Sequence, residues 1–137
     1  MTYDVLEKVS KKELMKAKKA VCFGIILLLF IWGNSFLTGL DSYNLTKFIF
    51  GELTDEVRIA VRKTAHLVEF FALSLVLIRV FKHRLIAAAI GMNVAVIDEY
   101  IQTLIPGREG RLEDVLIDCV GVLLAVCLFS RRKYVKD

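Results

Sequence analysis

The chain alternates long apolar runs with short charged segments. Residues 20–40 carry no charged side chain, over a length close to the roughly 20 residues that a helix needs to cross the hydrocarbon core of a bilayer. Residues 60–81, 85–105 and 114–130 are also mostly apolar, but each run contains ionisable side chains in one half. The pattern predicts an all-α integral membrane protein built as a four-helix transmembrane bundle.

The segment between the first two runs has a shorter pattern of its own. Leu45, Phe48, Ile49 and Leu53 recur at helical spacing, which predicts a short helix lying in the extracytoplasmic membrane interface. Thr54 comes next and is followed by two acidic residues. This order is typical of an N-cap and an acidic first helical turn, so the second span is expected to begin there.

Composition supports the membrane interpretation. Hydrophobic residues make up 56% of the 137 residues, and the mean hydropathy is +0.57. A small soluble domain could not bury that much apolar surface, and the length allows a single membrane domain over residues 1–137. The three cysteines form no CxxC pair, so they indicate neither a disulfide framework nor a zinc-binding motif.

The positive charges flank the apolar runs and predict the orientation. Thirteen of the 19 Lys and Arg residues lie before the first run, between the second and third, or after the fourth. Because cytoplasmic segments are enriched in Lys and Arg, both termini are expected in the cytoplasm of a multi-pass membrane protein. The net charge of +4 is thereby explained by topology, and we expect no nucleic-acid partner.

The polar residues inside the runs converge at the opposite, extracytoplasmic end. Glu69, Asp98 and Asp118 each lie seven or eight residues inside a span, or about 10–12 Å below the outer surface at 1.5 Å per residue. Their neighbours continue the same helix faces, since residues three or four apart lie together on a helix. These neighbours are Arg62 and His66 on the second span, Glu99 and Gln102 on the third, and Arg111 and Asp114 on the fourth.

Two stretches resemble a known family. The run RKTAHLVEF at residues 62–70 and the run DEYIQTLIPGREGRLEDVLIDCVG at residues 98–121 are similar to the two signatures of VanZ-like proteins. Order and spacing match over roughly residues 25–130, whereas Leu104 and Asp118 depart from the pattern. The resemblance implies a bacterial membrane family named for low-level teicoplanin resistance. Its motif residues here would be Lys63, His66, Glu69, Asp98, Glu99, Gln102, Arg108 and Asp114.

Three interpretations of the polar cluster are compatible with these residues. The charges could pair with each other and only hold the helices in register. They could instead bind an outer-leaflet amphiphile, with Arg62, Arg108 and Arg111 holding phosphate oxygens. That amphiphile would be a lipid-linked cell-wall precursor, a phospholipid, or the lipidated tail of a glycopeptide antibiotic. The predicted ligand-binding residues are Arg62, Lys63, His66, Glu69, Asp98, Glu99, Gln102, Arg108, Arg111, Asp114 and Asp118.

The third interpretation is an enzyme that acts on lipid headgroups. His66, Glu69 and Asp98 are then the catalytic candidates for acid–base work, and His66, Glu69, Asp98 and Asp114 form an alternative metal-ligand set. We expect no cofactor and no metal under the binding interpretation. A transporter would need more than four spans, which a dimer could provide, so an oligomer stays open.

Overall fold

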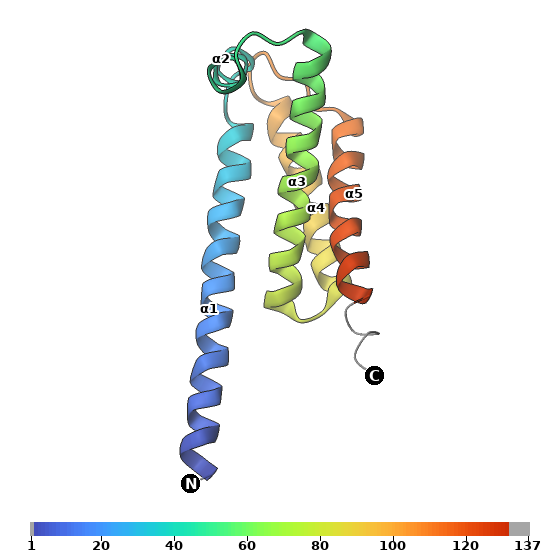
Figure 1. Ribbon diagram of the computed structural model, residues 1–137. Coiled ribbons are helices and arrows are strands. Elements are labelled where there is room, and N and C mark those ends of the chain that lie inside the picture. Colours follow the sequence, from blue (N-terminus) through green and yellow to red (C-terminus); the bar gives the residue numbers. More distant parts are fainter. Residues whose placement is uncertain (1, 132–137) are drawn as a thin grey trace.

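The computed structural model describes residues 2–131, with side chains described for residues 11–129. This part of the chain forms five helices and no strand, which confirms the all-α prediction. The helices are α1 (Thr2–Ser35), α2 (Gly39–Phe50), α3 (Asp55–Phe81), α4 (Arg84–Thr103) and α5 (Leu112–Arg131). Figure 1 shows α3, α4 and α5 packed side by side, with α1 running along them and α2 lying across one end.

The helix ends follow local sequence signals. Thr54 caps α3, because its side chain accepts a hydrogen bond from the Val57 amide, as the sequence predicts. Thr38 caps α2 in the same way through the Asp41 amide. The predicted interfacial segment is therefore a helix, α2. It begins at Gly39, inside the first apolar run, and ends at Phe50, before Leu53.

The first apolar run does not form one straight helix to residue 40. α1 ends at Ser35, and α2 leaves it at an angle of 112°. A close backbone approach fixes this bend, since the Gly39 amide donates to the Pro106 carbonyl at 3.2 Å. A Cβ atom at Gly39 would lie 2.1 Å from the Gly107 oxygen, so the loop after α4 requires a glycine there.

Length and composition identify two or three candidate membrane spans, where the sequence pattern predicts four. α3 and α4 are long and apolar enough to cross a membrane, and the bent pair α1 and α2 gives a third if it counts as one span. α5 has a sufficient length of 20 residues, but Glu113, Asp114 and Asp118 make its first half acidic.

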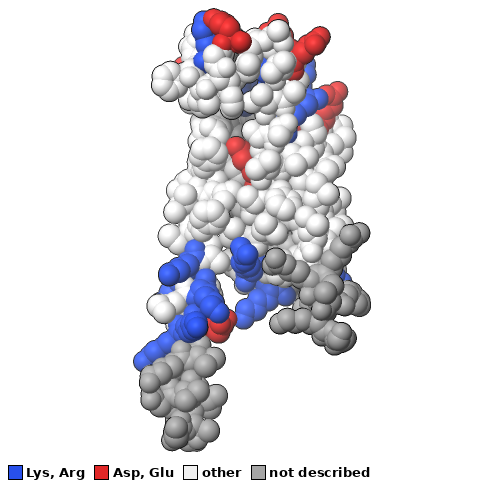
Figure 2. All heavy atoms as spheres, viewed as in Figure 1, with Lys and Arg blue, Asp and Glu red and all other residues white. Residues whose placement is uncertain are grey.

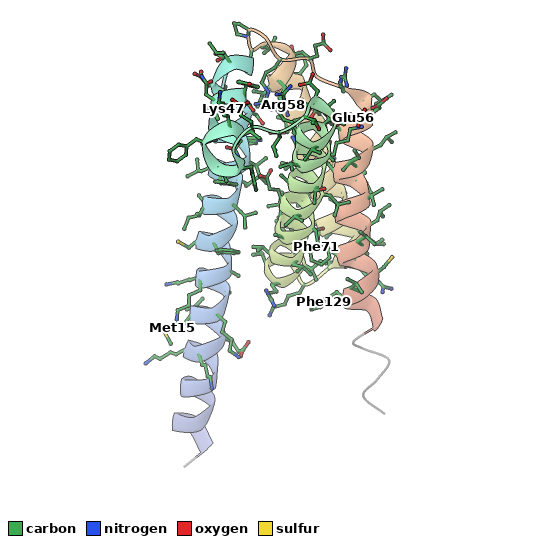
Figure 3. The ribbon with its side chains drawn as sticks, turned by 45° about the horizontal axis from the view of Figure 1, so that its top comes forward. Met15, Lys47, Glu56, Arg58, Phe71 and Phe129 are labelled. Atoms are coloured by element: carbon green, nitrogen blue, oxygen red, sulfur yellow. The ribbon has the colours of Figure 1, made fainter. Side chains whose placement is uncertain are left out.

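The surface has the distribution of apolar side chains that a membrane protein needs. Leu29 and Phe30 on α1 and Leu123, Leu124 and Leu128 on α5 point outward and are exposed. Exposed apolar surface on this scale is unfavourable in water and is expected against lipid. Figure 3 shows Met15 on the free part of α1, and Lys47, Glu56 and Arg58 at the opposite end around α2 and the start of α3.

The core lies between α3, α4 and α5, with one face of α1 added to it. Phe70 and Leu73 of α3 pack with Ala87 of α4 and Val122 of α5, and all four are fully buried. Ile31 is the buried residue that α1 contributes to this core. The helices therefore enclose a hydrophobic core in one half of the molecule, and the polar cluster occupies the other half.

Candidate functional site

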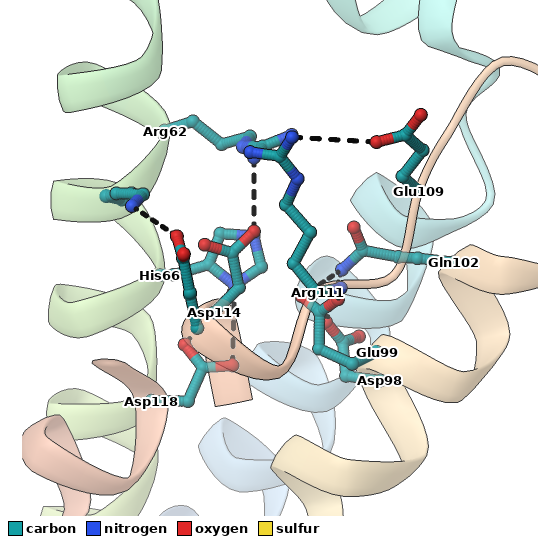
Figure 4. Close-up of polar contacts among 11 residues, drawn as sticks. Arg62, His66, Asp98, Glu99, Gln102, Glu109, Arg111, Asp114 and Asp118 are labelled. Atoms are coloured by element: carbon teal, nitrogen blue, oxygen red, sulfur yellow. Dashed lines mark hydrogen bonds and ion pairs between the residues drawn. The ribbon is translucent and has the colours of Figure 1, made fainter. Parts of the chain in front are cut away.

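Three helices and the end of α1 bring buried polar side chains together. His66 comes from α3, Asp98, Glu99 and Gln102 come from α4, and Asp114 and Asp118 come from α5. All six are less than 9% exposed. Figure 4 shows their side chains converging on one region between the helices. The prediction that separate segments place their polar residues together is confirmed by this arrangement.

The α4 side of the cluster is fully hydrogen-bonded. The Ser35 hydroxyl of α1 donates to Asp98 Oδ1 at 2.6 Å. Gln102 Nε2 lies 3.0 Å from Asp98 Oδ2 and 3.1 Å from Glu99 Oε1, and the Arg111 amide donates to Glu99 Oε2 at 2.9 Å. Each oxygen of both carboxylates thus has a donor, as buried acceptors require.

The α3 and α5 side consists of ion pairs between facing helices. Arg62 Nη2 lies 3.1 Å from Asp114 Oδ2, and Lys63 Nζ lies 3.2 Å from Glu113 Oε2. Deeper in the bundle, His66 Nδ1 lies 3.3 Å from Asp118 Oδ1 and 3.5 Å from its Oδ2. His66 therefore faces Asp118 across the helix interface.

Arg108 lies close enough to Asp98, Glu99 and Asp114 to interact with them electrostatically, but its hydrogen bonds go to backbone carbonyls. Its Nη1 donates to the Asn34 carbonyl at 2.5 Å and lies 3.5 Å from the Leu37 carbonyl. The Asn34 carbonyl lies in the last turn of α1 and Leu37 follows the helix; at this end a cation also interacts favourably with the helix dipole. Burial, with the like charge of Arg62, lowers the pKa of Arg108, although an arginine stays protonated at physiological pH.

The remaining predicted residues lie at the edge. Glu69 is half-buried and close enough to His66, Asp98 and Asp118 to interact electrostatically with each. Its carboxylate also lies beside the Asn34 side chain of α1. Arg111 is 46% exposed, with its guanidinium 3.6 Å from Glu109. All eleven predicted ligand-binding residues thus lie at the same end of the molecule.

Sequence reasoning missed two residues of α1 that complete the site. Ser35 is 2% exposed and contacts Asp98, and Asn34 contacts Glu69 and Arg108. Both stand in the uncharged first run as short polar residues near its end. Because periodicity relates residues of one helix only, no sequence signal joined them to α3 and α4.

Some buried polar atoms of the cluster have no hydrogen-bond partner. Among the described residues these are Asp114 Oδ1, Asp118 Oδ1 and Arg62 Nε. An unpaired buried polar group is costly, so the site has unused capacity for a ligand.

His66, Glu99 and Asp118 each offer one atom, and these atoms lie within 4.8 Å of one another. This is the group that could hold a metal ion, and it shares only His66 with the predicted alternative set.

Comparison with known protein families assigns the chain to one of them. The VanZ/LLP1 family model matches residues 20–133. The chain belongs to the VanZ/LLP1 family. No curated protein and no solved structure is detectably similar to it. Family membership and two helices apolar enough to span make this VanZ-like chain a membrane protein.

Proposed function

We propose that this VanZ-like protein crosses the bacterial cytoplasmic membrane four times and binds an outer-leaflet amphiphile at the end that carries the polar cluster. Binding lowers susceptibility to teicoplanin-type glycopeptides. The amphiphile has an apolar tail and a charged or hydroxylated headgroup, as in a lipid-linked cell-wall precursor, a phospholipid or the glycopeptide's own lipidated tail.

The distribution of charge supports the orientation. Figure 2 shows Lys and Arg gathered at the lower end beside α1, a nearly uncharged band above them, and mixed charges at the end with α2. An excess of cations favours the cytoplasmic side. The polar cluster then faces outward, where the outer leaflet supplies headgroups.

The observation that carries the proposal is a pair of partly exposed arginines beside buried acids. Arg62 and Arg111 lie on the same side of the cluster, beyond Asp114 (Figure 4). Arg62 keeps an unpartnered Nε, and the Arg111 guanidinium is largely exposed. A planar guanidinium can donate two parallel bonds to phosphate oxygens. Arg108 is not part of this set, because its Nη1 is bound to the Asn34 carbonyl of α1.

Glu69 supports an approach of the ligand from the lipid side. It is the partly exposed carboxylate among buried ones, and it lies between α1 and α3 beside Asn34. Figure 2 shows acidic atoms at the surface within the otherwise uncharged band. An ionised residue at this depth is unfavourable against hydrocarbon, so a headgroup amine or hydroxyl would be a favourable partner for it.

A second candidate function is catalysis on the same headgroup. The buried pairing of His66 with Asp118 is the kind of contact that orients an imidazole for proton transfer. The alternative enzyme interpretation thereby gains Asp118 as the partner of His66, in addition to the predicted candidates Glu69 and Asp98.

The test compares bound lipid and drug protection in matched variants. Glu69→Gln, Asp98→Asn and Arg111→Gln remove one charge each from the cluster and keep the approximate shape. Neutral substitutes lower the burial cost, so the proteins should still insert, whereas co-purified lipid and the teicoplanin inhibitory concentration should fall. Arg79→Gln is the control, because Arg79 is exposed at the other end of α3.

Mass spectrometry of the purified protein identifies the lipid and separates phospholipid from polyprenyl-linked precursor. Wild-type levels of bound lipid and of drug protection in all three cluster variants would rule out headgroup binding at this site. Loss of all three cluster variants from the membrane fraction would instead show that the charges are needed for assembly.

A further inference from the structure

The acids of the cluster differ in how many of their carboxylate oxygens accept a hydrogen bond. Asp98 and Glu99 have a donor on every oxygen. Asp118 is fully buried, and its Oδ1 makes no hydrogen bond, although it lies 3.3 Å from His66 Nδ1; Asp114 Oδ1, at 2% residue exposure, also lacks a hydrogen bond. Both oxygens belong to side chains one helical turn apart on α5, so both lie on one face of that helix. Such oxygens need a cation, a donor or a proton.

The spacing of His66 and Asp118 fits joint coordination better than a direct hydrogen bond. The distances of 3.3 and 3.5 Å from Nδ1 to the two oxygens exceed the roughly 2.7–2.9 Å of a charge-assisted hydrogen bond. Two ligands on one metal ion, at about 2.0–2.1 Å each in a tetrahedron, would be about 3.3–3.4 Å apart. Glu99 supplies a third ligand atom within 4.8 Å of the other two.

Charge gives a second reason for a cation. Asp98, Glu99 and Asp118 lie near one another. Of the nearby cations, Arg62 pairs with Asp114 and Arg108 interacts electrostatically with Asp98 and Glu99, so His66 is the basic group that faces Asp118. Carboxylates this close repel each other strongly in a medium of low dielectric constant. A divalent ion held between two of them would offset that repulsion at the point where the unpartnered oxygen lies.

We propose that His66, Glu99 and Asp118 bind one divalent transition-metal ion. The ligand set of one imidazole and two carboxylates suits Zn²⁺ or Mn²⁺. Gln102 and the Arg111 amide hold the Glu99 carboxylate in place, as outer partners of metal ligands do. Asp114 is the candidate for a fourth ligand, because its Oδ1 is free on the same face of α5.

This inference does not depend on the proposed lipid ligand. Metal binding can be measured on the protein in detergent without lipid, and bound lipid can be measured after the metal has been removed. The two proposals can therefore fail separately.

The experiment uses the full chain, purified in detergent and stripped with a chelator. Titration with ZnCl₂ and with MnCl₂ should show one ion bound per chain, with mass-spectrometric metal analysis after dialysis as the readout. His66→Gln and Asp118→Asn should weaken binding at least tenfold, on the order of the loss expected when a ligand or its support is removed. His83→Gln and Glu56→Gln are the controls, because both side chains are exposed and neither belongs to the cluster: His83 lies in the turn between α3 and α4, and Glu56 in the first turn of α3.

Three results would overturn the proposal. The first is no bound Zn²⁺ or Mn²⁺ in the wild type, which would mean that protons neutralise the acids. The second is equal binding by the wild type and both cluster variants, which would place the ion elsewhere. If both variants lose their helical circular dichroism, the test is the visible absorption spectrum of Co²⁺ added to the wild type. The third overturning result is that this spectrum remains that of the hydrated ion.

Discussion

At the scale of single residues, chemically similar side chains in this protein have different roles because their partners differ. Asp98 is held by Ser35 and Gln102, so it joins α1 to α4. Asp118 is just as buried, but one of its oxygens makes no hydrogen bond and lies beside His66, which suits it to binding a ligand. Arg108 and Arg111 differ in the same way, since one binds backbone carbonyls and the other is exposed.

The two arginines give a prediction about stability. Arg108→Ala removes a charge-assisted bond to the Asn34 carbonyl and should lower the free energy of unfolding by about 1–3 kcal/mol. Arg111→Ala removes only an exposed contact with Glu109 and should change it by less than about 1 kcal/mol. Denaturant unfolding in detergent, followed by circular dichroism, measures both. Equal losses in the two variants would contradict the role assigned to Arg108.

At the scale of elements, the shift of each helix along its axis and its rotation about that axis determine which charged side chains pair. Small residues allow the helices to approach most closely. A Cβ atom at Gly121 of α5 would lie 2.5 Å from the Leu67 carbonyl oxygen of α3. Small residues are the usual means by which membrane helices bring their backbones together. This contact holds α5 against α3 at the level where His66 meets Asp118.

Gly121 is therefore expected to be sensitive to a single methyl group. Gly121→Ala should destabilise the protein by about 1–3 kcal/mol, because backbone atoms must shift to admit the Cβ. Gly33→Ala is the matched control in α1, where a Cβ meets nothing within 4 Å. That variant should be neutral or stabilising by about 0.5–1 kcal/mol, as for Gly to Ala within a helix. Thermal unfolding of both variants in one detergent is the measurement, and a Gly121→Ala protein as stable as Gly33→Ala would exclude close packing at this point.

At the scale of the whole molecule, the orientation in the membrane decides which leaflet the cluster meets. Basic residues are concentrated at the end opposite α2 (Figure 2). Those after Arg131 that entered the charge count lie outside the described residues. The turn between α3 and α4 lies at the basic end, and the loop before α5 lies at the cluster end (Figure 1).

We accordingly predict that both termini and residues 82–84 are cytoplasmic, and that residues 41–58 and 107–111 are outside. Single cysteines at Ser42, Lys82 and Glu109, in a chain lacking its own three cysteines, can be labelled in intact cells with a membrane-impermeant reagent. Positions 42 and 109 should react and position 82 should not. The reverse pattern would mean that the protein has the opposite orientation, and reaction at 42 without reaction at 109 would remove α4 from the set of spans.

The sequence by itself determined most of the helices and the site residues on α3, α4 and α5, but not Asn34 and Ser35 of α1. Apolar periodicity and the threonine caps depend on neighbours a few residues away, so the helices and the N-cap at Thr54 could be predicted. Spacing of three and four residues also placed His66 with Glu69 on one face and Asp98 with Gln102 on another. Chain direction then predicted that these faces meet at one end.

Only the tertiary structure decided which side chains touch. The bend after Ser35, the contact of Arg108 with α1, and the grouping of His66 with Glu99 and Asp118 join residues far apart in the chain. Such pairs depend on how far each helix is turned and shifted against its neighbour. Packing at close contacts such as Gly121 with Leu67 sets that turn and shift, and the spacing of residues within a single helix carries no information about it.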